Sequence, residues 1–172
     1  MDRVGYELYS KLLKEELTGE RQTTAELDIR ANAYISEKYV ESSAGRLDCY
    51  KQIAEISSVA DYKRVYASLT ETYGDVPKAT ENLMVIAVLK NYAAKFNVEK
   101  IAVSGALGSL QFPSLESIGS KGVLAAMDKY KDDVRFNMTE APVIEFSGTR
   151  DSAHLMAKMT KFLKFALTFN GL

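Results

Sequence analysis

Side chains capable of metal or nucleophilic chemistry are few in this sequence and lie far apart. His154 is the one histidine and Cys49 the one cysteine, and over half of the chain separates them. A zinc site or a cysteine–histidine nucleophile needs such groups close together in the fold. Each residue falls on a predicted helix, where we expect His154 to be a partly buried structural residue and Cys49 to pack in or beside the core.

Three pairs of carboxylates are close in the sequence: Glu15 with Glu16, Asp132 with Asp133, and Glu26 with Asp28. The first two pairs fall near predicted helix ends, where charged side chains are normally solvated. The third pair shares the polar face of one predicted strand, and the sequence offers it no third oxygen ligand of the kind that a bound cation needs. We therefore predict no catalytic residue, no metal site and no cofactor.

The glycine-rich segment Gly105-Ala-Leu-Gly108 follows a predicted strand, which is the usual place for a phosphate-binding loop. It lacks the lysine and the hydroxyl residue of a P-loop, and it lacks the third glycine of a dinucleotide-binding turn. We interpret this segment as the turn of a β-hairpin.

The overall charge argues against a dedicated nucleic-acid module, because 22 basic residues are balanced by 23 acidic ones. One local feature keeps that function open as the alternative: Lys158, Lys161 and Lys164 recur along the last predicted helix, with Lys129 and Lys131 elsewhere. A single cysteine fits a reducing compartment, and no signal peptide or membrane span is recognised. We expect a soluble, cytoplasmic protein with no membrane partner.

The first half of the chain is predicted to be mainly helical, with a helix at 6–17, a strand at 24–31, and helices at 46–57, 58–73 and 77–96. Ser58 and Asp61 form a capping-box-like start. Gly74 fits the left-handed position after a helix, and Pro77 fits the first turn of the next one. The 46–57 helix is expected to bury Leu47, Tyr50 and Ile53.

The second half is predicted to contain strands at 101–103 and 110–112, a helix at 120–130, a hairpin of strands 134–138 and 143–146, and a final helix from Asp151 or Ser152 to Phe169. The final helix is expected to bury Leu155, Met159, Phe162, Ala166 and Phe169. The fold class is therefore α+β: a helical half with one short strand, then a small antiparallel βαββα lobe. We expect one compact unit whose lobes meet near Asn97.

A possible partner-binding surface is suggested by acidic residues. The segment from Glu15 to Asp48 carries eight acidic residues against four basic ones. Glu71, Tyr73 and Asp75 add two carboxylates and an aromatic ring around the end of a predicted helix. Such a surface suits docking on arginine side chains, although an ordinary solvated face has the same composition.

Five sequence motifs occur in an order that resembles one family, with the resemblance clearest over residues 4–100. They are Gly5-Tyr-Glu-Leu-Tyr9, the strand Glu26 to Arg30, Arg46-Leu-Asp-Cys-Tyr-Lys51, Glu71-Thr-Tyr-Gly-Asp-Val-Pro77 and Glu81-Asn-Leu83. The chain resembles the C-terminal domain of bacterial transcription-repair-coupling factors. The family often has an arginine where Thr72 stands, so a salt bridge from position 72 is not expected here.

The resemblance implies a non-catalytic part of a larger ATP-driven DNA translocase, which displaces stalled RNA polymerase and recruits excision repair. It implies a division into a linking helix from the motor at 1–20, a mainly helical lobe at 21–97 and an α/β lobe at 98–172. None of the motor's ATP-binding motifs is present, so we expect the chain to be one domain of that longer protein.

By the same resemblance, the domain is expected to act as an autoinhibitory clasp. Its partners would be the N-terminal repair-recruiting module and the motor lobes of the same protein, and indirectly the damage-recognition protein, RNA polymerase and DNA. The residues expected to make the contact are Glu71, Tyr73, Asp75 and Asp48, and those expected to maintain the local structure are Arg46, Tyr50, Gly74 and Pro77.

Overall fold

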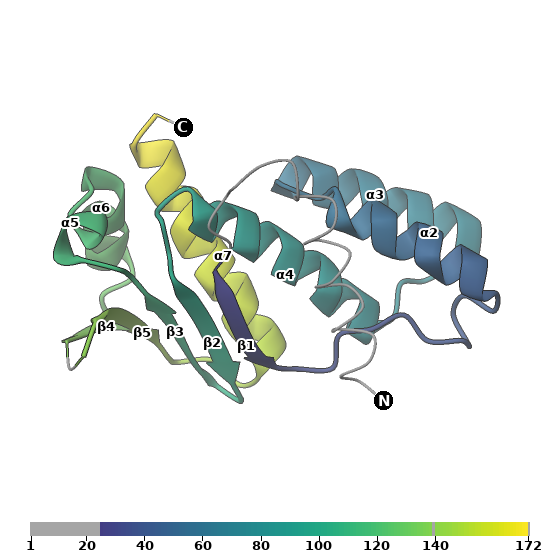
Figure 1. Ribbon diagram of the computed structural model, residues 1–172, viewed down its shortest axis with the longest axis horizontal. Helices are drawn as coiled ribbons and strands as arrows, with labels where there is room; N and C mark the ends of the chain where they lie inside the picture. The colour runs from purple at the N-terminus through teal and green to yellow at the C-terminus, as the bar shows by residue number, and fades with distance from the viewer. Residues whose placement is uncertain (1–24, 139, 172) are drawn as a thin grey trace. The chain divides into compact units, whose positions relative to one another are not determined.

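The computed structural model describes residues 25–138 and 140–171, which form an α+β fold (Figure 1). The helix predicted at 6–17 lies outside the described residues. The described chain groups into two compact units, one made of residues 32–88 and the other of residues 25–31 with 89–171. We call these unit 1 and unit 2 and describe each by itself.

Unit 1 contains α2 (Ser43–Ala54), α3 (Val59–Tyr73) and the first part of α4 (Lys78–Ala94). The starts of α2 and α3 follow from serine caps: the Ser42 side chain accepts from the Gly45 amide, and the Ser58 side chain accepts from the Asp61 amide. The Asp61 carboxylate in turn accepts from the amide and hydroxyl of Ser57, so the predicted capping box is extended by one residue. Local sequence therefore fixes where these helices begin.

The turn between α3 and α4 confirms the prediction for Gly74, which has a φ of +88°. A side chain in this left-handed region would be strained, which is why glycine suits the position. Pro77 immediately precedes α4, and its carbonyl accepts the first helical hydrogen bond, from the Glu81 amide at 2.9 Å. A proline costs nothing at that position because its missing N–H would have no helical partner.

The buried face of α2 differs from the prediction at one residue. Cys49, Tyr50 and Ile53 are buried as expected, whereas Leu47 is 38% exposed. At 100° per residue, Leu47 lies about 120° around the helix axis from Ile53, on the shoulder of the buried arc. The expectation that Leu47 belongs to the core was wrong.

Unit 2 is built on a five-stranded sheet in the order β1-β2-β3-β5-β4. The strands are β1 (Glu26–Arg30), β2 (Lys100–Ser104), β3 (Leu107–Gln111), β4 (Val134–Met138) and β5 (Pro142–Phe146). β1 runs parallel to β2 and the other neighbours are antiparallel, so the sheet is mixed. The parallel addition of β1 was not part of the predicted antiparallel lobe.

Three helices complete unit 2: α5 (Leu115–Ile118), α6 (Lys121–Lys129) and α7 (Ser152–Phe169), of which α7 crosses one face of the sheet (Figure 1). The Asp151 side chain caps α7 by accepting from the His154 amide. The predicted buried stripe of α7 is confirmed except at Phe169, which is 56% exposed. Phe169 is the last helical residue, and its ring packs on Phe165 rather than in the core.

Two glycines allow α7 to pack closely. A Cβ atom at Gly108 of β3 would lie 2.9 Å from side-chain atoms of both Leu155 and Met159. A Cβ at Gly122 of α6 would collide with the carbonyl of Ala166. Within the described residues, no helix is both long enough and apolar enough to cross a membrane.

Candidate functional site

The Arg46–Lys51 motif holds the chain segment that precedes α2. The Arg46 guanidinium donates to the carbonyls of Val40 and Glu41, both at 2.9 Å. The Tyr50 hydroxyl accepts a buried hydrogen bond from the Ile35 amide at 3.0 Å. The arginine and the tyrosine of the motif therefore satisfy main-chain groups of residues 35–41.

Side chains of α4 hold the same segment. The Asn82 amide donates to the carbonyl of Asn32 at 2.8 Å, and the Thr80 hydroxyl donates to the carbonyl of Tyr34 at 3.2 Å. Asn82 and Thr80 are themselves buried. Because irregular main chain inside a protein must find partners for its polar groups, these contacts explain how residues 32–40 can be ordered without regular structure.

Tyr39, at the end of this segment, lies at the centre of the candidate partner-binding surface. Its hydroxyl is 3.2 Å from the Leu69 carbonyl and 3.1 Å from the Gly74 carbonyl, so its single proton can bond to either. Its ring packs on that of Tyr73, with centroids 5.8 Å apart and planes tilted by 59°. Tyr39 thus fixes the position of Tyr73 at the end of α3.

Asp48 and Asp75 are next in sequence to residues that contact this pair of rings: Asp48 precedes Cys49, which hydrogen-bonds to Tyr73, and Asp75 follows Gly74, whose carbonyl accepts from the Tyr39 hydroxyl. A charge on Cys49 is the main influence that raises the pKa of Tyr73, followed by loss of solvent, a hydrogen bond to Cys49 and the charge of Asp48. Burial is the main cause that raises the pKa of Tyr39, and Asp75 adds to it. We call Asp48, Tyr73 and Asp75 the Tyr73 cluster, because each carboxylate is next in sequence to a residue that contacts the Tyr39–Tyr73 pair.

Glu71 lies apart from the Tyr73 cluster. It is two residues before Tyr73 in α3, so the two side chains leave opposite sides of the helix. Glu71 is exposed to solvent, and Tyr73 is 37% exposed. Glu71 and Tyr73 thus leave opposite sides of α3, while Asp75 follows the end of this helix and Asp48 is on α2.

The last turn of α3 carries acidic charge without a basic residue of its own. α3, which is described along its whole length, has no basic residue in its last turn, where Glu71 stands. The carbonyls at the end of a helix carry partial negative charge, so an acidic side chain there costs about 0.3–1 kcal/mol. A cationic group supplied by a partner would remove that cost.

The remaining candidates for chemistry are occupied by structural contacts. Cys49 is buried as expected, and burial is the main cause that raises the pKa of its thiol. His154 is exposed rather than partly buried: its ring contacts the cap residue Asp151 at 2.7 Å and Arg150 at 2.8 Å, outside the apolar stripe of α7. No group of three potential metal ligands occurs within the described ranges.

The last two candidates from the sequence are the glycine-rich segment and the lysine row of α7. Gly105, with a φ of +60°, sits in the two-residue turn between the paired ends Ser104 and Leu107, so the glycine-rich segment is a hairpin turn. The lysine row of α7 is partly used inside unit 2, because the Lys158 ammonium binds Asp133 at 2.9 Å and the Ser147 carbonyl at 3.1 Å. Lys161 and Lys164 remain exposed.

Unit 2 also has a groove of about 420 Å³ beside the starts of β4 and β3. Its charged lining includes residues of both signs, and one of them, Asp133, is already paired with Lys158. Arg135 and Glu145, also in the lining, face each other across neighbouring strands. The groove therefore presents compensated charge rather than a set of convergent polar groups directed at a ligand.

Comparison with known proteins identifies the family. A family model described as the TRCF domain matches residues 29–123, which is more than half of the 172 residues. The chain belongs to the TRCF domain family. The match covers the Arg46–Lys51 motif, the Tyr73 cluster and Glu71.

Similar proteins carry the same family name. The transcription-repair-coupling factor of Bacillus subtilis is 31% identical over 108 residues, covering 59% of this TRCF domain and 9% of that protein. The factor of Haemophilus influenzae is 26% identical over 151 residues, covering 80% and 13% respectively. The chain therefore spans about a tenth of the length of these curated relatives.

A solved structure shares the fold. The crystal structure of a C-terminal domain of transcription-repair coupling factor superposes with a TM-score of 0.70 at 16% identity, covering 85% of this chain and 94% of that one. The fold similarity thus extends over most of the chain, including unit 2, where the sequence resemblance is weak.

Proposed function

We propose that this TRCF domain is a regulatory interaction domain of a transcription-repair-coupling factor, and that it covers the N-terminal repair-recruiting module of the same protein. Family membership supports the identity of the parent. The observation that carries the masking role is the helix end of α3, where acidic side chains lie at the negative end of the helix dipole without a basic residue in the last turn.

The contact would be made by carboxylates on arginine side chains, with an aromatic ring between them. Asp48, Asp75 and the partly exposed Tyr73 form one side of this surface and Glu71 the other. Leu47, 38% exposed on the neighbouring helix, adds an apolar contact. Arginine suits such a site because its planar guanidinium pairs with carboxylates and stacks on aromatic rings.

The strength of this contact must be modest if it is to open. An exposed ion pair contributes about 0–1 kcal/mol, so a few pairs give only a few kcal/mol together. Covalent linkage within one protein raises the effective concentration of the two surfaces and keeps them closed at that strength. Movement of the motor during translocation can then shift the balance towards the open form.

The test is charge reversal in the full-length parent protein. Glu71→Lys combined with Asp75→Lys should raise the affinity of the parent for its excision-repair partner, because the repair-recruiting module is uncovered. Glu55→Lys is the matched control, since Glu55 is exposed in the same unit and follows the end of α2. Equal affinities for the wild type, the double variant and the control would refute the masking role.

We assign the ATP-driven step to the motor lobes of the parent. The TRCF domain acts on that step only by holding or releasing the module it covers. The chain alone is therefore expected to show no ATP hydrolysis, with or without DNA, and turnover by the purified chain would contradict this division of labour.

A further inference from the structure

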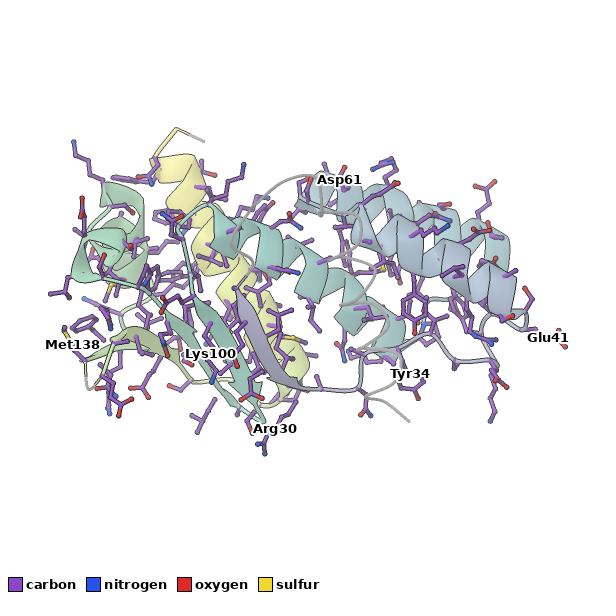
Figure 2. The ribbon with its side chains drawn as sticks, in the orientation of Figure 1. Arg30, Tyr34, Glu41, Asp61, Lys100 and Met138 are labelled. Carbon is purple, nitrogen blue, oxygen red and sulfur yellow. The ribbon has the colours of Figure 1, made fainter. Side chains whose placement is uncertain are left out.

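The two outer strands of the sheet in unit 2 differ in character. β1 presents the exposed charged side chains of Glu26, Asp28 and Arg30, and charged edges resist pairing with another strand. β4, at the other edge, has Phe136 42% exposed and Met138 53% exposed. Figure 2 shows Met138 at the opposite side of this sheet from Arg30. β4 is therefore the edge that is open to pairing.

The register of the sheet decides which main-chain groups of β4 point outward. The Ser147 amide donates to the Asp133 carbonyl at 2.9 Å, which continues the β4–β5 ladder by one pair. Bonded and non-bonded pairs alternate along an antiparallel ladder, so the even-numbered residues of β4 point away from β5. Val134 agrees, because its amide donates instead to the Tyr130 carbonyl at 3.1 Å.

The outward groups available for pairing belong to Val134, Phe136 and Met138. The amide of Val134 is used by Tyr130, which leaves its carbonyl. Within the part of the chain that the structure describes, no partner is seen for the amide and carbonyl of Phe136 or for the amide of Met138. These groups lie beside the two exposed apolar side chains of the strand.

We propose that two copies of this chain pair edge to edge through β4, antiparallel, about a two-fold axis at Phe136. In this register the two Phe136 residues exchange hydrogen bonds, and each Met138 amide donates to the Val134 carbonyl of the second copy. About four intermolecular hydrogen bonds result, as expected for one short antiparallel ladder. All the outward groups named above are then used.

The side chains fit the same register. Val134, Phe136 and Met138 lie on one sheet face and meet their counterparts, so both exposed apolar side chains become covered. On the other face Arg135 lies opposite Asn137 of the second copy. A register shifted by two residues towards the strand start would place Arg135 opposite Arg135, which is unfavourable. Charge repulsion therefore favours the register centred on Phe136 over the one that would pair Arg135 with Arg135.

The pairing closes on itself. A two-fold contact uses the β4 edge of both copies, and the edges left outside are the charged β1 strands. The assembly therefore stops at a dimer. It involves unit 2 only and stands whether or not unit 1 covers another module.

Sedimentation equilibrium of the 172-residue chain tests the proposal. The weight-average mass should rise from the monomer value of 19.1 kDa towards twice that value as concentration increases. Phe136→Lys should raise the dissociation constant of the dimer at least about tenfold. The substitution removes a ring that the dimer would cover and places two positive charges opposite each other at the two-fold axis. Leu124→Lys, at a 52% exposed site on α6, is the matched control and should leave the dimer unchanged.

Two substitutions at one residue test the register. Asn137→Glu places a carboxylate opposite each Arg135 and should tighten the dimer, whereas Asn137→Arg places like charges there and should weaken it. Far-UV circular dichroism verifies that the variants fold. A mass that stays at one chain over the whole concentration series, or a dimer that responds equally to both Asn137 variants, would overturn the proposal.

Discussion

Tyr50 should be one of the most sensitive positions of unit 1, because a single hydroxyl serves a buried main-chain group. Tyr50 is 3% exposed and Ile35 is 5% exposed, and the hydroxyl accepts from the Ile35 amide at 3.0 Å. Tyr50→Phe keeps the ring but leaves that amide without its acceptor. An unsatisfied buried donor costs about 1–3 kcal/mol, and for a chain of this size each kcal/mol lowers Tm by about 2–4 °C.

The matched control is Tyr34→Phe in the same segment. Tyr34 is only half-buried, and no hydrogen bond from its hydroxyl is seen among the described residues, so its loss should cost under about 0.5 kcal/mol. Urea unfolding gives the two free energies, and amide exchange at Ile35 gives a local readout. If Tyr50→Phe unfolds at the wild-type urea concentration, or if Tyr34→Phe is equally destabilised, the role assigned to the hydroxyl is wrong.

Three further predictions concern other parts of the fold. Two hydrogen bonds from Ser57 lower the pKa of Asp61 to about 2, and Arg64 contributes to this shift. The ionised Asp61 carboxylate therefore stabilises the fold fully above its unfolded pKa near 4, and this stabilisation is lost as the pH falls towards 2. Because the side chain is partly exposed, we expect Asp61→Asn to lower the free energy of unfolding by only about 1 kcal/mol at pH 7, and by progressively less below pH 4. Urea unfolding measures this, and a difference between variant and wild type that is the same at every pH would contradict it. Gly122→Ala should lower the free energy of unfolding by about 1–3 kcal/mol, because the added Cβ would collide with the Ala166 carbonyl. Gly171→Ala is the control and should lower it less, because its Cβ would lie in open space and only its φ of +80° is unfavourable for alanine. If Lys161 and Lys164 bound DNA, the binding would be seen at low salt and would weaken steeply as the salt concentration rises. We expect a DNA titration of the chain to show no binding at physiological salt.

Local features of the fold could be predicted from the sequence because short-range physics decides them. Ser58, Gly74 and Asp151 act at helix ends through their own backbone angles or neighbouring amides, and each behaves as expected. The turn at Gly105 is equally local. The pairing of β1 with β2 was missed because it joins Leu27 to Ile101, and nothing in either segment identifies the other.

The candidate site could be predicted only in part. Tyr73 and Asp75 are close in sequence, so their proximity was visible. Asp48 is on the preceding helix, α2, and was included among the contact residues only through the family resemblance. The central position of Tyr39 was not, since it contacts Leu69 and Gly74 through hydrogen bonds that span 30 and 35 residues. The opposite placement of Glu71 could have been found from helical geometry, because residues two apart leave opposite sides of a helix.

Calorimetric titration of this chain against the N-terminal module of its parent tests the masking account most directly. The account predicts binding that weakens with salt, is reduced at least about tenfold by Glu71→Lys with Asp75→Lys, and is unaffected by Glu55→Lys. Binding of the double variant at wild-type affinity, or no binding of the wild-type chain at low salt, would contradict it.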